Sequence, residues 1–390
     1  MAKSKRGHLA FGMANIILLG VVSFLNDMSS EMIMPILPMF LTSLGATGII
    51  IGLIGGLRES ISSILKVFGG LWADRVGKRK PFVTFGYLAS AVFKVFLAFS
   101  RTWPFALVFA SVERTGKGIR TAPRDAIIAE SMPKRHGWGF GIHRTLDTSG
   151  AILGAVLVFL LFWFWGFSFK TLILTAAIIS FVSLVPMIWV REKKKRPEKV
   201  TLKVGLKKLP QKARLFIIIA SLFALANFSY MFFILRAQHF FSEELAIAVP
   251  ILLYVLFNIF YAGFAIPFGN LSDRVGRENV IVAGYVMFFA TCIGFAFANS
   301  ITLLIFLFIL YGLHLGAFEP VQKTFISELS PEKYRASTLG AYQMIVGLCA
   351  LPASLIAGIL WDNIDKFAPF YFSLIMTAAS IILILFVKER

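Results

Sequence analysis

The sequence predicts an all-α polytopic membrane protein whose twelve transmembrane helices form two related halves. Of its 390 residues, 58% are hydrophobic and only 15% are charged, and the mean hydropathy is +0.80. A soluble domain carries roughly 25% charged residues, so this chain has too few of them to cover a surface in water. Its apolar runs are long enough to cross about 30 Å of hydrocarbon as helices, and they lack the period-two alternation of a membrane β-barrel.

Each of the twelve helices is predicted from an apolar run between loops that carry the charged residues. The predicted segments are 10–40, 47–72, 81–99, 103–125, 139–164, 169–190, 214–236, 246–270, 279–298, 300–326, 337–361 and 367–387. The first run follows a basic N-terminus, contains Asn26, Asp27 and Glu31, and shows no small-residue cleavage site. It is therefore expected to be a retained helix and not a signal peptide.

Lysine and arginine gather in alternate loops. With the N-terminus in the cytoplasm, the basic residues that fall inside are Lys3, Lys5, Arg6, Arg75, Lys78, Arg79, Lys80, Lys134, Arg135, those of residues 191–213, Arg274, Arg277, Lys333, Arg335, Lys388 and Arg390. Outside fall only Arg101, Lys170, Lys366 and, at a helix end, Arg236. This is the asymmetry that the positive-inside rule requires. It predicts a multi-pass protein of the cytoplasmic membrane with both termini in the cytoplasm, and it accounts for the net charge of +19 without nucleic acid.

Two stretches of the sequence recur almost 200 positions apart. Residues 70–79 (GLWADRVGKR) nearly recur as residues 269–278 (GNLSDRVGRE), an offset of 199, and Glu130 to Pro133 corresponds to Glu328 to Pro331 at an offset of 198. Two matches at nearly one offset indicate an internal duplication. A duplicated membrane bundle with a short charged loop at the same place in each half is the architecture of many transporters.

The division between the halves is predicted from a change in composition. Residues 1–190 are expected to form an N-terminal six-helix bundle and residues 214–390 a C-terminal one, joined by a basic cytoplasmic linker at 191–213. The linker contains ten Lys and Arg residues, interrupted by Pro197 and Pro210, and has a weakly apolar side. Two interpretations stay open: the linker lies on the inner leaflet, attracted by anionic lipid, or it is a solvated connector whose charge sets the topology.

The repeated loop resembles a known family signature. The pattern G-x-x-x-D-R-x-G-x-R-K is met between the second and third helices by Gly70, Asp74, Arg75, Gly77, Arg79 and Lys80, and it resembles the signature loop of the major facilitator superfamily. The second copy keeps Gly269, Asp273, Arg274, Gly276 and Arg277 and departs at Glu278 and Asn279. Two weaker family patterns are R-x-x-x-G at Arg114 and Gly118, and an acidic residue followed by P-x-x-P at Asp27, Pro35 and Pro38. The resemblance spans essentially the whole chain and implies that superfamily's fold, with two pseudo-symmetric six-helix bundles.

The loop also has a physical interpretation of its own. Gly70 lets the second helix approach a neighbour closely, and Gly77 permits a tight turn. Asp74 can accept hydrogen bonds from a facing helix N-terminus or pair with an arginine. In the superfamily this loop acts as a cytoplasmic latch that holds one conformation, and the resemblance implies the same for Asp74 and Arg75. The alternative is a purely topogenic loop, but an aspartate has no topological role there.

Charges inside the membrane are candidates for function, because each costs at least ~2.5–3.5 kcal/mol at mid-bilayer. At about 1.5 Å per residue, five of them lie roughly 14–17 Å below the outer face. They are Asp27 on the first helix, Arg58 and Glu59 on the second, and Glu113 and Arg114 on the fourth, with Glu31 one turn beyond Asp27. These six residues are predicted to line a central cavity and couple transport to protons. Asp27 is the first candidate for the proton carrier, and Arg114 would tune the acid or hold an anionic substrate.

Further charges approach the cytoplasmic face. Beyond the residues of the repeated loop, the predicted cytoplasmic gate consists of Lys117, Arg120, Arg124, Asp125, Arg144 and Asp147. Salt bridges that close the gate, or long side chains that reach the headgroups, are the interpretations favoured over substrate contact.

The C-terminal half carries fewer charges and more aromatic and amide side chains. The residues predicted to line its part of the substrate cavity are Asn227, Tyr230, Asn258, Tyr261, His314, Glu319 and Gln343. Such a lining suits an amphipathic or apolar ligand, although a lone histidine is more often a packed residue. Cys292 and Cys349 lie in apolar runs and are expected to be packing residues, so no metal site or cofactor is predicted.

The expected function is therefore secondary active transport of a small molecule by alternating access. Resemblance to proton-coupled drug exporters, through Arg114 and Gly118, favours proton-coupled export of an amphipathic compound, although Lys117 stands where those exporters usually have an uncharged residue. The alternatives are proton-coupled transport of a small organic anion and, in a different class, a gradient-independent lipid scramblase. No G-x-x-x-x-G-K-[ST] loop or HExxH motif is present, so neither ATP-driven transport nor an enzyme is expected. The expected partners are substrate, protons and membrane lipids, for a chain that acts as a monomer.

Overall fold

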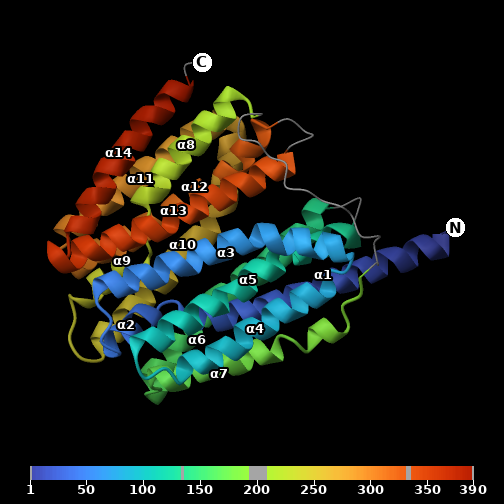
Figure 1. Ribbon diagram of the computed structural model, residues 1–390, viewed down its shortest axis with the longest axis horizontal. Helices are drawn as coiled ribbons and strands as arrows, with labels where there is room; N and C mark the ends of the chain where they lie inside the picture. The colour runs from blue at the N-terminus through green and yellow to red at the C-terminus, as the bar shows by residue number, and fades with distance from the viewer. Residues whose placement is uncertain (1, 133–135, 193–208, 331–334, 389–390) are drawn as a thin grey trace. The chain divides into compact units, whose positions relative to one another are not determined.

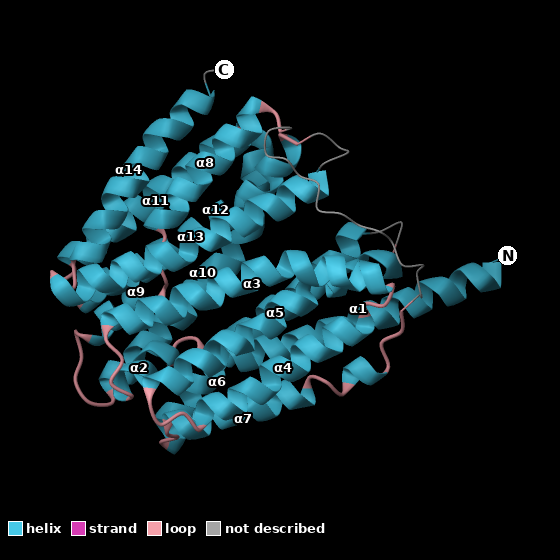
Figure 2. Ribbon diagram, viewed as in Figure 1, coloured by secondary structure: helices cyan, strands magenta, loops and turns pink. Residues whose placement is uncertain are grey.

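The computed structural model describes residues 2–132, 136–192, 209–330 and 335–388, and these are helices joined by short loops (Figures 1 and 2). In the first half the elements are α1 (Ala2–Ile33), α2 (Leu37–Ser43), α3 (Gly48–Val76), α4 (Lys80–Ala98), α5 (Trp103–Ser131), α6 (His136–Trp165), α7 (Phe169–Val182) and the 3₁₀ turn η1 (Pro186–Ile188). In the second they are α8 (Gln211–Ala226), α9 (Met231–Gln238), α10 (Leu245–Val275), α11 (Arg277–Phe297), α12 (Ile301–Glu328), α13 (Arg335–Asn363) and α14 (Ala368–Lys388). The all-α membrane fold is confirmed. Linker residues 193–208 lie outside the described chain.

Eleven of the described segments are long and apolar enough to cross a membrane. The remaining long helix, α5, has 29 residues but carries Glu113, Arg114, Lys117, Arg120, Arg124 and Asp125 along its second half. These charges separate α5 from the other spans, and they concentrate the polar chemistry of the first half on one helix.

Three of the predicted helices are wrong as continuous elements: segment 169–190 ends as an α-helix at Val182, before the 3₁₀ turn η1, and two others are each divided into two α-helices. The predicted segment 10–40 is divided at residues 34–36, where Pro35 cannot donate a backbone hydrogen bond, into α1 and α2. The predicted segment 214–236 is divided at residues 227–230 into α8 and α9. The two interruptions fall in corresponding helices of the repeated halves. Interrupted helices at matching positions point to a binding site in transporters built from repeats.

Packing divides the chain into two compact units, Met1–Ile36 with Ile61–Thr201 and Leu37–Ser60 with Leu202–Arg390. In the first unit α1 packs against α6 and α7, and α4 packs against α5 and α7. In the second, α12 packs against α10 and α11, while α14 packs against α8 and α11. The sequence-based boundaries 1–190, 191–213 and 214–390 remain a prediction.

The first turns of α3 belong to the second unit because they are held by α13. The backbone N–H groups of Gly48 and Ile49 each donate to the Asp362 carboxylate at 2.8 Å. The Ser60 hydroxyl donates to the Gly347 carbonyl at 2.8 Å. A carboxylate at a helix N-terminus satisfies free N–H groups and matches the helix dipole, so Asp362 fixes the start of α3.

Small residues allow α6 to lie directly against α1. A Cβ placed at Gly154 would stand 2.9 Å from the Met28 Cα, and one placed at Gly150 would stand 2.9 Å from the Phe24 Cα. These two glycines, four residues apart, form the small-xxx-small pattern that brings membrane helices into backbone contact.

We expect Gly154→Ala to destabilise the protein by about 1–3 kcal/mol, because the added methyl group overpacks the α1–α6 contact. Gly263→Ala is the matched control: it changes a glycine inside α10 that has nothing within 4 Å of the new methyl, and it should be neutral or slightly stabilising. Thermal unfolding in detergent measures both. Equal unfolding temperatures for the two variants would contradict the close contact.

Candidate functional site

The middle of α5 holds a buried ion pair in the first unit. The Arg114 Nε lies 3.6 Å from the Glu113 carboxylate, and both side chains are about 95% buried, at 6% and 5% exposed. The partner helix is close because Gly118, the glycine of the R-x-x-x-G pattern, faces α3: a Cβ there would stand 2.6 Å from the Leu65 Cβ. Glu113 and Arg114 were predicted to line a central cavity, and the structure buries both within the first unit.

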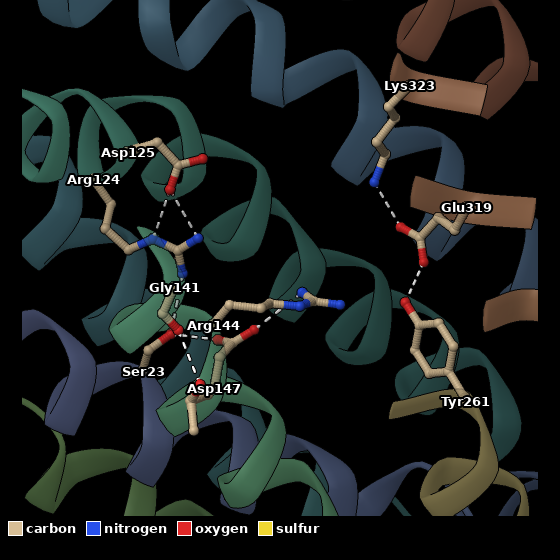
Figure 3. A network of polar contacts seen from close by, with 10 residues as sticks. Ser23, Arg124, Asp125, Gly141, Arg144, Asp147, Tyr261, Glu319 and Lys323 are labelled. Carbon is tan, nitrogen blue, oxygen red and sulfur yellow. Dashed lines mark hydrogen bonds and ion pairs between the residues drawn. The ribbon is translucent and has the colours of Figure 1, made fainter. Parts of the chain in front are cut away.

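A pair of carboxyl groups links α1 to α6. The side chains of Asp27 and Asp147 are hydrogen-bond partners, and the Ser23 hydroxyl, one turn before Asp27, donates to Asp147 at 2.6 Å (Figure 3). The charged groups that act most strongly on Asp27 are Asp147, Lys117 and Arg120. A hydrogen bond between two carboxyl groups needs a proton on one of them, so this pair is a place where the bundle can hold a proton.

Arginines approach the same carboxyl pair from two helices. Arg124 of α5 donates to the Ser23 hydroxyl at 3.1 Å and forms an ion pair with Asp125 at 3.0 Å (Figure 3). Arg144 of α6 reaches Asp147 at 3.3 Å, and its side chain is 63% exposed. The four predicted gate residues Arg124, Asp125, Arg144 and Asp147 therefore form one connected group, and that group also includes Asp27.

Arg120, which was predicted as a gate residue, is almost completely buried inside the first unit. It is 2% exposed, donates to the Ser90 hydroxyl of α4 at 2.9 Å, and lies 4.4 Å from the centre of the Tyr87 ring. This side chain joins α5 to α4 by a charge-assisted hydrogen bond and a cation–π contact. Lys117, one turn earlier, is half-buried on the side of Asp27.

The repeated loop forms a three-residue ion cluster in the first unit. Arg79 bridges Asp74, at 3.0 Å, and Glu130 at the end of α5, at 2.5 Å. Burial lowers the pKa of the Arg79 guanidinium, but the hydrogen bonds that it donates to Glu130 and Asp74 outweigh burial, and the net pKa lies above its ordinary value. Gly77 has a φ of 71°, as the tight turn requires.

The second unit repeats this cluster with one residue fewer between the aspartate and the arginine. Arg277 forms ion pairs with Asp273 and with Glu328 at the end of α12, at 3.0 Å for the second pair. Gly276 has a φ of 95°. The sequence alignment that set Glu278 against Arg79 is therefore off by one: Arg277 takes the place of Arg79, and the apparent departure at Glu278 and Asn279 reflects a shorter turn.

The remaining loop residues have smaller structural roles. A Cβ at Gly70 would stand 3.1 Å from the Ala122 Cβ, whereas at the preceding Gly69 it would meet the Ile119 carbonyl oxygen at 2.6 Å. Gly69 thus makes the closer approach to α5. Gly269 has nothing within 4 Å, and the side chains of Arg75 and Arg274 are exposed.

Glu192, an acidic residue after η1, contacts the start of α4 in the first unit. The backbone N–H groups of Arg79 and Lys80, where α4 begins, both donate to the Glu192 carboxylate at 2.7 Å. Asn15 of α1 holds the neighbouring Arg191 backbone through both its N–H and its carbonyl. The first residues after η1 are therefore tied to the signature loop and to α1.

In the second unit, a polar group forms between α10 and α12. The Tyr261 hydroxyl donates to the Glu319 carboxylate, which also pairs with Lys323 at 2.7 Å (Figure 3). The side chains of Glu319 and Lys323 are 41% and 45% exposed, so this group is open and not sealed in the core. Tyr230, at the interruption between α8 and α9, lies with its ring 5.7 Å from that of Tyr254.

The other residues predicted to line the cavity differ in how far their side chains are buried. His314 is fully buried among aromatic rings and hydrogen-bonds to the Gly284 carbonyl at 2.7 Å, and Asn258 is buried and donates to the Tyr254 carbonyl of its own helix. Asn227 ends α8 and is half-buried, as are Gln343 and Glu31. On α3, Arg58 is buried and Glu59 is exposed. Among the described side chains, no three His, Cys, Asp or Glu residues gather to hold a metal ion.

Several participating residues are absent from the predicted set. They are Ser23, Ser29, Ser30, Tyr87, Ser90, Lys94, Glu130, Glu192, Lys323 and Glu328. The duplication itself held the signal for Glu130 and Glu328, because both belong to the second repeated stretch. The serines give no such signal, since a small hydroxyl in an apolar helix is common.

We expect Arg79→Ala to lower stability by about 1.5–3 kcal/mol, because it leaves two partly buried carboxylates without their shared donor. Arg277→Ala should cost less than about 1 kcal/mol, because its partners Asp273 and Glu328 are 59% and 52% exposed. Thermal unfolding of the two variants in the same detergent makes the comparison. A loss for Arg277→Ala as large as that for Arg79→Ala would show that burial does not decide the difference.

Comparisons with known proteins agree on one family. The family model of the Major Facilitator Superfamily matches residues 19–247 and 237–390. The MFS-type transporter MJ1317 of Methanocaldococcus jannaschii is 52% identical over 377 residues, which cover 96% of this chain and 94% of the relative. Multidrug resistance protein MdtH of Aeromonas hydrophila is 24% identical over 338 residues, 85% of this chain and 83% of MdtH. The crystal structure of the nucleoside transporter NupG has the same fold, with a TM-score of 0.78 at 16% identity over 96% of this chain and 98% of NupG. The chain therefore belongs to the major facilitator superfamily of membrane transporters.

Proposed function

We propose that this transporter is a proton-coupled secondary transporter that exports amphipathic compounds by alternating access. The observation that carries the proposal is the carboxyl pair Asp27–Asp147, which joins α1 to α6 inside the first unit. One proton shared by the two groups removes their mutual repulsion, and that proton is the one we assign to coupling.

The surroundings of the pair supply a way to release the proton. Arg144 already reaches Asp147 and is largely exposed, while Arg124, whose charge also acts on Asp147, is bound to Asp125 and to the Ser23 hydroxyl. A guanidinium that moves closer favours the ionised carboxyl groups, and one that moves away favours the protonated pair. A conformational change that shifts α6 against α1 would therefore bind the proton in one state and release it in the other.

The proposed substrate class rests on the second unit and on the relatives. The Tyr261–Glu319–Lys323 group is open. The Tyr261 ring is connected through Phe257 to the ring of Tyr254 on α10, which in turn contacts Tyr230 at the start of α9. A carboxylate beside aromatic rings suits an amphipathic compound that carries a positive charge. Relatives named multidrug resistance proteins MdtH and MdtG support this class and the direction of export.

One observation favours a second candidate, export or uptake of an organic anion. Two arginines of the described first unit are buried: Arg120 at 2% and Arg114 at 5% exposed. Only Arg114 has a carboxylate within ion-pair distance among the ion pairs described. An anionic substrate that reached them would replace missing counter-charge.

We expect Asp27→Asn to abolish transport driven by a pH gradient while substrate exchange partly survives, because the amide cannot carry the proton. The measurement uses proteoliposomes with an imposed pH gradient, with ethidium as the amphipathic cation and carboxyfluorescein as the organic anion. Asp365→Asn is the matched control: Asp365 only accepts backbone hydrogen bonds from Phe367 and Ala368, which an asparagine oxygen can also accept.

Undiminished uphill ethidium movement in Asp27→Asn would refute the coupling assignment. Gradient-driven movement of carboxyfluorescein alone would favour the organic-anion candidate. Lipid movement that continues at equal pH on both sides, with neither probe transported, would point to a scramblase.

We expect Glu319→Gln to weaken ethidium transport about tenfold in apparent KM, because a charge-assisted contact is lost and a tenfold change corresponds to about 1.4 kcal/mol. Carboxyfluorescein movement should be unaffected or improved. Initial rates over a range of probe concentrations give both values. An unchanged KM for ethidium would remove Glu319 from the proposed site.

A further inference from the structure

Lys94 of α4 is a fully buried lysine at the junction of three helices. Its Nζ lies 2.8 Å from the Ser29 hydroxyl oxygen and 3.1 Å from that of Ser30, both on α1. The Ser29 hydroxyl in turn donates to the Ala176 carbonyl of α7 at 2.5 Å. The side chain is 0% exposed, so its amine has no route to water in this conformation.

No carboxylate of the described chain forms an ion pair with Lys94. The charged groups that act on it are Glu113, Arg120, Asp27 and Arg114, two of each sign. The third helix packed around it, α7, has no ionisable side chain between residues 171 and 182. An ammonium buried without a carboxylate partner is unfavourable by several kcal/mol, so the positive form is poorly matched to this site.

The hydrogen-bond count leads to the same result. An ammonium group has three N–H donors, and the side chains around Lys94 offer two acceptors, Ser29 and Ser30. The neutral amine has two N–H donors and one lone pair. It can donate to Ser29, whose own hydrogen is used by Ala176, and accept the hydroxyl hydrogen of Ser30. That arrangement uses the hydrogens of both serines and the lone pair of the amine. One N–H has no acceptor among these side chains in either form, so the neutral form leaves one hydrogen fewer unpaired, that of Ser30.

We propose that Lys94 is a second proton-binding group of the transport cycle, with its amine neutral in this conformation and protonated when α1 moves away. The step is a simple proton addition: the nitrogen lone pair takes a proton from water, and the contact from Ser30 reverses direction. This role deepens the proposed function and rests on it, since a coupled cycle is what would use the proton.

A single turn of α1 connects Lys94 to the carboxyl pair. Asp27 on this turn hydrogen-bonds to Asp147 of α6, and Asn26 accepts a hydrogen bond from Ser180 of α7 at 3.2 Å. Ser29 and Ser30 complete the turn against Lys94. A movement of α1 that exposes one proton-binding group therefore alters the other, and protonation of Lys94 would favour the conformation in which these contacts are broken.

The test uses stability and needs no substrate. If Lys94 is neutral when folded but takes a proton when unfolded, the unfolded state binds one more proton, so stability rises with pH below the ordinary lysine pKa of about 10.4. Relative to Lys94→Met, the unfolding equilibrium constant of the unchanged protein should fall up to tenfold per pH unit between pH about 7 and about 9. Thermal and denaturant unfolding of the full chain in detergent provide this comparison.

Three variants make the result specific. Lys94→Met keeps the apolar stem and should be at least as stable as the unchanged protein at pH about 7, whereas Lys94→Arg forces a permanent charge into the site and should be much less stable. The exposed Lys366→Met is the control and should leave the pH slope unchanged. The proposal is overturned by a slope that is the same with and without Lys94, by Lys94→Arg matching the unchanged protein, or by failure of Lys94→Met to fold.

These outcomes are separate from those for the proposed function. Loss of the pH slope in Lys94→Met shows the neutral amine even if Asp27→Asn still transports uphill. If the dependence of stability on pH is the same with and without Lys94, the role of Lys94 is refuted. The role of Asp27 and Asp147 is then still tested by the transport measurements.

Discussion

A charged side chain inside hydrocarbon must be matched within the helix bundle, and this requirement shapes the first unit. Helix α5 carries seven ionisable residues, and most of those with described contacts lie against a partner of opposite charge, a hydroxyl or an aromatic ring. The glycines that let α5 touch α3, and α6 touch α1, bring those partners within reach. The charges can therefore be paired only because the helices pack closely.

Two ionisable side chains of the first unit lack a partner of opposite charge among the ion pairs described, and both are candidates for proton binding. Asp27 hydrogen-bonds to another acid and not to a base, and Lys94 hydrogen-bonds to two serines and forms no ion pair among those described. Both groups bind or release a proton more readily than a well-matched ion pair would. Asp27 lies on the same turn of α1 as Ser29 and Ser30, the two serines that contact Lys94. Helix α1, which contacts α4, α6 and α7, is therefore the element through which protonation can act on conformation.

The sequence predicted the fold well because its signals were redundant. Apolar runs, alternate basic loops and a duplicated stretch each indicated a two-part helical membrane protein, and the ion clusters Asp74–Arg79–Glu130 and Asp273–Arg277–Glu328 show the duplication in three dimensions. The interruptions at residues 34–36 and 227–230 were missed because hydropathy does not register a break in backbone hydrogen bonding.

The site was harder to predict than the fold. Depth along a helix can be counted, so Glu113 and Arg114 were placed at one level, but the direction in which each side chain points depends on helix rotation. That rotation puts Asp147 against Asp27, buries Arg120 beside Tyr87, and encloses His314. The one-residue difference between the repeated loops was also invisible until the place of Arg277 was known.

The central claim is that Asp27 and Asp147 share a proton inside the first unit. Infrared spectroscopy of the protein in lipid at neutral pH tests it most directly, because a protonated carboxyl group has a carbonyl band separate from those of carboxylates and amides. The account predicts such a band in the unchanged protein, shifted by isotope-labelled aspartate and absent when either aspartate is replaced by asparagine. A spectrum with no protonated aspartate, or one whose band survives both replacements, would contradict it.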